Sequence, residues 1–249
     1  MKTVLIGDIH GRTNWKRIVR RNSDAERFVF FGDYFDPYEF IPIHEQIANF
    51  EAIVEFAMDA TIEVVLLLGN HDLHYYADVE TCSRYDRVNS VKISKAIDEA
   101  LMFMRVAYQF DNVLCTHAGV SPKWMDKHIT KGWSLKNIVR RIEDLHDDNP
   151  QAFAYQDEDI SGYGASPDQG PMWIRPESLI SVNKKDTRIS DTLVQAFGHT
   201  QVDNIEATLD SCKKYFDGKY IMVDGLEDGG YIVHEGGEFT ARTVNMRYR

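Results

Sequence analysis

The sequence predicts an α/β fold built around a largely parallel β-sheet. Five short apolar runs each lead directly into a polar loop that contains glycine, and helix-like stretches separate the first three runs. A continuous apolar run of this length is typical of a strand buried on both faces. Strands that alternate with helices form βαβ units around a twisted sheet. A chain of 249 residues is long enough to bury a full core, so we expect one domain over residues 1–249.

The elements follow one another in a regular order along the first 200 residues. The five strands and their loops are residues 3–6 and 7–11, 28–31 and 32–36, 64–68 and 69–72, 113–115 and 116–119, and 193–197 and 198–200. The predicted helices are residues 14–21, 43–60, 92–102 and 134–146. In open sheets of this kind ligands bind at the carboxyl ends of the strands, so we expect the five loops to converge on one edge.

Two later segments have a different pattern. Short apolar runs separated by glycine-containing turns predict antiparallel strands of a second sheet at residues 205–209, 220–223, 231–233 and 239–243. The polar stretch of residues 147–185 is rich in glycine and proline. A structureless stretch of that length in a compact domain is usually functional, so we expect an active-site loop or lid there.

Composition restricts the class of protein. The chain has 28 basic and 39 acidic residues, a net charge of −11, which disfavours nucleic acid as a partner. Its longest apolar runs fall far short of the roughly 20 residues of a membrane helix, and the N-terminal run is too short for a secretory signal. The three cysteines are widely spaced, which predicts buried structural thiols without disulfides. We therefore expect a cytoplasmic protein without a membrane partner.

The five loops carry the side chains that divalent metals prefer, namely carboxylate, imidazole and amide oxygen. Asp8 and His10 are two residues apart and can point the same way as the chain leaves an extended strand. A glycine directly precedes Asp8, Asp33, Asn70 and His199, where it permits a close backbone approach to a ligand. The candidate metal ligands are Asp8, His10, Asp33, Asn70, His117 and His199.

Together the loops resemble the five motifs of calcineurin-like metallophosphoesterases. These motifs are Gly7-Asp8-Ile9-His10-Gly11, Gly32-Asp33-Tyr34-Phe35-Asp36, Gly69-Asn70-His71-Asp72, Thr116-His117-Ala118-Gly119 and Gly198-His199-Thr200. They are closest in form to the phosphoprotein-phosphatase branch, which includes phage and bacterial protein phosphatases and bis(5'-nucleosyl)-tetraphosphatases. The resemblance implies a four-layer αββα sandwich, with two mixed sheets flanked by helices.

The resemblance also implies a dinuclear metal site. Asp8, His10 and Asp33 would bind one metal, and Asp33 would bridge to a second held also by Asn70, His117 and His199. The metals would be manganese in the first place, with iron, zinc or cobalt as alternatives. A metal-bridging hydroxide would attack phosphorus directly, since coordination lowers the pKa of water.

His71 belongs to the third motif, but the resemblance does not make it a metal ligand. By resemblance it protonates the leaving oxygen while Asp36 orients its ring. Imidazole suits this role because its ordinary pKa lies near the working pH.

The second motif departs from the family pattern after Asp36. The family continues with Arg-Gly, whose arginine grips the substrate phosphate, whereas this chain has Pro37-Tyr38. Arg175 resembles the family's other phosphate-binding arginine. Four further cations near the loops are candidates to replace the missing one, namely Arg12, Arg84, Arg87 and Lys123.

Three functions remain open at this point. The leading hypothesis is hydrolysis of phosphate monoesters, on phosphoproteins or small molecules. The second is a nucleotide hydrolase that cleaves dinucleoside polyphosphates or phosphodiesters. The third is a non-catalytic scaffold, against which stand the six intact ligand positions and the His71–Asp36 pair.

Overall fold

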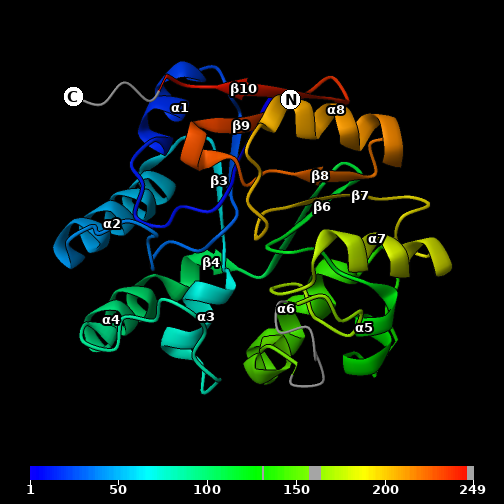
Figure 1. Cartoon of the computed structure of the whole chain (residues 1–249), viewed down its shortest axis with the longest axis horizontal. Coiled ribbons are helices and arrows are strands. Elements are labelled where there is room, and N and C mark those ends of the chain that lie inside the picture. The colour runs from blue at the N-terminus through cyan, green and yellow to red at the C-terminus, as the bar shows by residue number, and fades with distance from the viewer. Residues whose placement is uncertain (131, 157–163, 246–249) are drawn as a thin grey trace.

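The structure is a computed structural model that describes residues 1–130, 132–156 and 164–245. Two mixed β-sheets pack face to face, with helices on both outer sides, which confirms the four-layer αββα sandwich (Figure 1). The strands are β1 (Thr3–Ile6), β2 (Arg27–Phe30), β3 (Glu63–Leu67), β4 (Met104–Arg105), β5 (Ala107–Phe110), β6 (Val113–Thr116), β7 (Val194–Phe197), β8 (Tyr220–Met222), β9 (Gly230–Glu235) and β10 (Glu238–Thr243). The α-helices are α1 (Trp15–Arg21), α2 (Ile43–Asp59), α3 (Asn70–Tyr76), α4 (Ser90–Ala100), α5 (Pro122–His128), α6 (Ile138–Asp148), α7 (Pro176–Lys185) and α8 (Ile205–Phe216).

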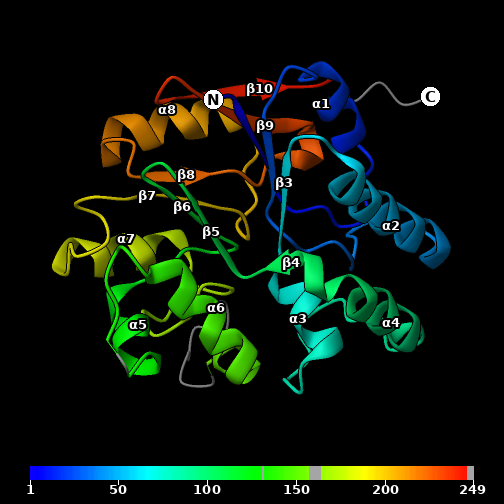
Figure 2. The ribbon, with the colours of Figure 1, turned by 180° about the vertical axis from the view of Figure 1, so that it is seen from behind.

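The first sheet has the strand order β10-β9-β1-β2-β3-β4, and the second has the order β5-β6-β7-β8. Strands β1, β2 and β3 pair in parallel, as do β6, β7 and β8. Helices α1, α2 and α4 lie on one side of the molecule and α5 to α8 on the other, as the two opposite views show (Figure 2). The carboxyl ends of the parallel strands therefore share one edge of the sandwich.

Side chains along β1, β2 and β3 alternate between two apolar layers, because successive residues of a strand point to opposite faces. The residues that face the second sheet are Leu5, Val29, Phe31, Val65 and Leu67. Those that face the outer helices are Val4, Ile6, Phe28, Phe30, Leu66 and Leu68. Since both faces of the sheet are covered, the strands appear in the sequence as unbroken apolar runs.

The prediction of a strand at residues 205–209 is wrong, because this segment begins helix α8. The Asn204 side chain accepts a hydrogen bond from the Ala207 backbone N–H, as a helix cap does. Ile205, Leu209 and Cys212 are buried at helical spacing. The predicted sheet is also wrong in part. Strands β9 and β10 do pair antiparallel, but they extend the first sheet beside β1, while β8 runs parallel to β7.

Residues 147–185 are not structureless. They contain a short 3-10 helix (Pro150–Phe153) and helix α7, whose first residue is Pro176. Residues 157–163 lie outside the described residues. The four predicted helices are present with ends shifted by up to four residues, whereas α3, α5 and α7 were not predicted. Within the described ranges no helix has the length and apolar character needed to cross a membrane.

One buried carboxylate joins the loops that follow β2 and β3. Asp72 Oδ2 accepts the backbone N–H groups of Asp33 and Gly69, each at 2.8 Å, and Oδ1 accepts the N–H of Tyr34 at 2.9 Å. Asp72 has no exposed surface. Three backbone hydrogen bonds to one buried side chain join the two loops, so Asp72 sets their spacing.

We expect Asp72→Asn to destabilise the fold. The amide would present an NH₂ group to a backbone N–H and leave a buried donor unsatisfied, at a cost of about 1–3 kcal/mol. Urea unfolding of the two proteins measures this difference. Asp210→Asn is the matched control, because Asp210 is exposed on α8. Equal unfolding midpoints for Asp72→Asn and the control would contradict the role of Asp72.

Candidate metal centre

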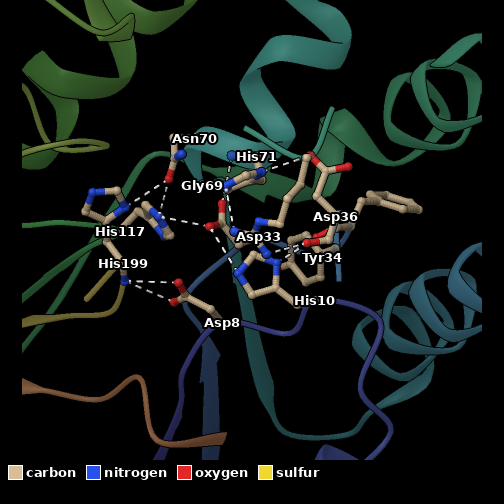
Figure 3. A network of polar contacts seen from close by, with 12 residues as sticks. Asp8, His10, Asp33, Tyr34, Asp36, Gly69, Asn70, His71, His117 and His199 are labelled. Carbon is tan, nitrogen blue, oxygen red and sulfur yellow. Dashed lines mark hydrogen bonds and ion pairs between the residues drawn. The ribbon is translucent and has the colours of Figure 1, made fainter. Parts of the chain in front are cut away.

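The structure brings all six predicted metal ligands together at the carboxyl ends of five strands (Figure 3). Asp8 and His10 follow β1, Asp33 follows β2, and Asn70 follows β3. His117 and His199 follow β6 and β7 of the second sheet, so both sheets contribute to one cluster.

The Asp33 carboxylate lies at the centre of the cluster. Its Oδ2 atom is 3.7 Å from Nε2 of His10 and 3.6 Å from Nε2 of His117. Asn70 Oδ1 lies 2.9 Å from Nε2 of His117 and 3.0 Å from Nδ1 of His199. Asp33 therefore lies between two sets of candidate ligands. One set is in the loop after β1, and the other is in the loops after β3, β6 and β7.

Backbone carbonyls hold two of the imidazoles in one tautomer. His10 Nδ1 donates to Phe35 O at 2.7 Å, and His117 Nδ1 donates to Phe31 O at 2.6 Å, because a carbonyl only accepts. Burial lowers the pKa of His10 to about 3 and also lowers the pKa of His117, so both rings are neutral. Each ring thus directs an Nε2 lone pair at Asp33, which is the arrangement of a metal-ligating histidine.

The chemistry of these donors fits bound cations. With Nδ1 of His117 protonated, its Nε2 and the facing Asn70 Oδ1 are both acceptors, which repel each other unless a cation lies between them. Nε2 of His199 is buried and has no hydrogen-bond partner among the described residues. Ligand atoms of Asp8, His10 and Asp33 all lie within 4.8 Å of one another. The site residues therefore suit one cation on each side of Asp33.

Carboxylate crowding supports the same conclusion. Burial and the negative charges of Asp224 and Asp33 raise the pKa of Asp8. Burial also raises the pKa of Asp224, a neighbour of Asp8 that the sequence analysis missed. Cations bound here would offset this repulsion, since they are the largest local charges in such sites.

Two of the motif glycines make room for these carboxylates. A Cβ atom on Gly69 would collide with Oδ1 of Asp33, and one on Gly198 would collide with Oδ1 of Asp8. The close approach expected at these glycines is therefore made by a carboxylate from a neighbouring loop.

Backbone strain is concentrated at the same place. Among the described residues, seven non-glycine residues have positive φ, and five of these belong to the site or its wall. They are His10, Asp33, Asp36, Arg84 and His199. A non-glycine residue in this region costs energy, and such residues cluster at functional sites.

His71 and Asp36 form a buried pair beside the cluster. His71 Nδ1 is 2.8 Å from Oδ2 of Asp36. Helix α3 places two more side chains on the same carboxylate, with His74 Nε2 at 2.9 Å and the Tyr75 hydroxyl at 2.5 Å. His74 therefore helps to hold the Asp36 carboxylate in place. The i, i+3, i+4 spacing of these three residues is the sequence signal for this arrangement.

A pocket of about 480 Å³ opens above the cluster, and its wall includes Arg84 and Arg175. Arg175 Nη1 donates to His199 O at 3.2 Å and to Thr200 Oγ1 at 3.1 Å. Of the four cations considered as replacements for the missing arginine, Arg84 alone lines the described pocket. Arg12 pairs with Glu227, Lys123 pairs with Asp168, and Arg87 is exposed outside the pocket.

Aromatic and sulfur-containing side chains complete the wall. Tyr38, Tyr155 and Trp173 line the pocket, whereas Trp124 is fully buried in the core. Cys115 and Cys212 are buried as expected, but Cys82 is only half-buried and lines the pocket.

Two missed carboxylates have a recognisable sequence signal in retrospect. Asp72 occupies the third position of helix α3 after Gly69, where a side chain can reach back to backbone N–H groups. Asp224 follows an apolar strand and begins a polar loop that contains glycine, as the predicted ligand loops do, although its glycine (Gly225) comes after the carboxylate and not before it.

Two curated relatives resemble parts of this chain. The symmetrical bis(5'-nucleosyl)-tetraphosphatase of Edwardsiella ictaluri is 28% identical over 136 residues, which is 50% of this chain and 46% of the relative. The corresponding protein of Aliivibrio salmonicida is 29% identical over 103 residues, 32% of this chain and 38% of the relative. The matched region thus spans less than half the length of these relatives.

Solved structures share the fold. The cold-active protein-tyrosine phosphatase of a psychrophilic Shewanella species has a TM-score of 0.63 and 18% identity, covering 97% of this chain and 80% of that chain. A protein serine/threonine phosphatase from Saccharomyces cerevisiae has a TM-score of 0.56 and 14% identity, covering 100% and 81%. Finally, the family model described as calcineurin-like phosphoesterase matches residues 1–203. The resemblance of the five motifs is thereby confirmed: the chain belongs to the calcineurin-like phosphoesterase family.

Proposed function

We propose that this chain is a phosphoesterase that hydrolyses phosphate monoesters with the help of two divalent cations. The observation that carries this proposal is the position of the Asp33 carboxylate, which lies between the Nε2 atoms of His10 and His117. A carboxylate with imidazole and amide oxygen on either side is suited to bridge two cations.

The donors divide into two sets that share Asp33. Asp8, His10 and Asp33 would hold one cation, and Asp33, Asn70, His117 and His199 would hold the other. When bound, two such cations lower the pKa of water and stabilise negative charge around phosphorus. Manganese is the expected metal, and the same donors also accept iron, zinc or cobalt.

His71 would supply the proton for the leaving oxygen. Asp36 holds Nδ1 and so directs Nε2 toward the pocket, where His71 is one of the lining residues. Because Asp36 also accepts from His74 and Tyr75, its carboxylate is fixed, and the His71 ring has one orientation. Arg175, on the His199 side of the pocket, would bind phosphate oxygens through its guanidinium.

The second candidate is a nucleotide hydrolase acting on dinucleoside polyphosphates. Two observations favour it. The curated relatives are named as symmetrical tetraphosphatases, and three aromatic side chains line the pocket, where a base could stack.

Turnover of four substrates separates these candidates. The manganese-loaded protein would be given p-nitrophenyl phosphate, its bis-ester, a phosphopeptide and diadenosine tetraphosphate. We expect the highest kcat/KM on the phosphopeptide or on p-nitrophenyl phosphate. A clear preference for diadenosine tetraphosphate would support the nucleotide hydrolase, and inactivity on all four with metal bound would support a scaffold.

Metal binding can be tested without substrate. We expect the wild-type chain to bind two equivalents of manganese and to unfold at a higher temperature with the metal than after chelation. Saturation at 100 times Kd adds about 2.7 kcal/mol. Asp33→Asn should lose most of this rise, whereas Asp59→Asn, at an exposed residue of α2, should keep it. Elemental analysis and thermal unfolding measure both quantities. Wild-type binding retained by Asp33→Asn would contradict the bridging role.

We expect His71→Asn to lower kcat about 10²–10⁴-fold, the usual worth of a positioned proton donor, with bound manganese unchanged. His44→Asn is the matched control because His44 is exposed on α2. Steady-state kinetics and elemental analysis are the measurements. A variant that lost both metals, or kept its turnover, would remove His71 from this role.

A further inference from the structure

Arg84 brings a second guanidinium to the pocket in an acidic chain. It lines the same pocket as Arg175 and the predicted metal ligands. Among the described residues it forms no ion pair with a carboxylate, although the chain carries a net charge of −11. A guanidinium without a carboxylate partner beside a cluster of anion-binding groups is available to an anionic ligand.

Its contacts point it at the reacting edge of His71. Arg84 Nη1 donates to the backbone oxygen of Asp36 at 2.6 Å, and Nη2 lies 3.0 Å from Nε2 of His71. Since a guanidinium only donates, His71 Nε2 carries no proton while it accepts this bond, and it takes up a proton from solvent when the contact with Arg84 is given up. Arg84 therefore occupies the position beside Nε2 that a leaving oxygen would need.

The guanidinium is held in place on its other side. Its central carbon lies 3.7 Å from the ring centroid of Tyr38, a stacking distance, and Tyr38 itself is 58% exposed. The backbone of Arg84 has φ +64°, in the left-handed region that non-glycine residues seldom adopt. The turn at this residue thus carries strain while it directs the side chain into the pocket.

We propose that Arg84 is a substrate-binding residue. Its guanidinium binds the phosphate and gives up its contact with His71 Nε2, so that the leaving oxygen can approach that nitrogen. This inference rests on the proposed phosphoesterase function. Arg84 and Arg175 reach the pocket from different segments, so a phosphate above the cluster receives N–H donors from both. Two of the five Arg84 N–H groups are used by Asp36 and His71, and the rest donate to no acceptor in the described part of the chain.

A structural role for Arg84 gives a different expectation. If Arg84 only held the Asp36 loop, its loss would lower stability or kcat without weakening the binding of phosphate. A substrate-binding residue must change phosphate affinity and KM. The test therefore measures the affinity for inorganic phosphate, because this measurement does not depend on turnover.

Arg84→Gln and Arg84→Lys would be compared with the wild type, each loaded with manganese and checked for metal content and thermal unfolding. Arg87→Gln is the matched control, because Arg87 is exposed in the same loop and lies outside the pocket. Calorimetric titration with inorganic phosphate gives Kd, and p-nitrophenyl phosphate hydrolysis gives kcat and KM.

We expect Arg84→Gln to raise the phosphate Kd roughly 10-fold to 100-fold, as the loss of charge-assisted hydrogen bonds does, and to raise KM in parallel. The phosphate Kd and the KM of Arg84→Lys should lie between those of the wild type and Arg84→Gln, since lysine keeps the positive charge but cannot form the paired hydrogen bonds of a guanidinium. The Arg87→Gln values should equal those of the wild type.

Unchanged phosphate affinity in Arg84→Gln, with metal content intact, would overturn the inference, and so would failure of the wild type to bind phosphate at millimolar concentration. Failure of the proposed function is seen separately. A wild type that binds phosphate but hydrolyses no ester would refute the enzyme, while the Kd comparison would still decide whether Arg84 binds phosphate.

Discussion

The carboxylate of Asp72 is the constraint on which the rest of the site depends. It accepts backbone N–H groups from the ends of two neighbouring strands, at Asp33, Tyr34 and Gly69. Asp33 Oδ1 then accepts the N–H of His71, so the central carboxylate and the candidate proton donor are tied to one another. Because these bonds are made to backbone N–H groups, they fix the positions of the loops, and thereby the positions from which the site side chains start.

The buried carboxylates of the site favour the binding of cations. Asp8, Asp33, Asp72 and Asp224 are buried close together, and their mutual repulsion opposes folding. The imidazoles of His10 and His117 do not neutralise them, because burial keeps both rings uncharged. Bound cations would offset this repulsion, and metal binding at such a site would be coupled to stability. The left-handed backbone at His10, Asp33 and His199 adds strain that the surrounding contacts have to hold.

The pocket wall, more than the candidate metal ligands, distinguishes the substrate classes of the proposed function. On the proposed function the candidate ligands would accept any phosphate ester, whereas Arg84 and Arg175 would favour an accessible, doubly charged phosphate. The aromatic residues on the rim suit a flat organic group attached to it. On that proposal, discrimination between a phosphoprotein and a nucleotide would lie in the loops that follow α3 and precede α7, and not in the five motifs.

The amino-acid sequence by itself determined the strands and their ligand loops, because a strand buried on both faces leaves a continuous apolar run and each glycine marks a close approach. It also determined the long helices, whose apolar periodicity is local. It did not determine α8, where the Asn204 cap and the spacing of Leu209 and Cys212 outweighed an apolar run that resembles a strand. Only the tertiary structure shows that Arg84, of the four candidate cations, lines the pocket, and that Asp72 joins two loops. The bonds of Asp72 to Asp33 and Tyr34, and those of Arg84 to Asp36 and His71, join segments far apart in the sequence, which local spacing does not reveal.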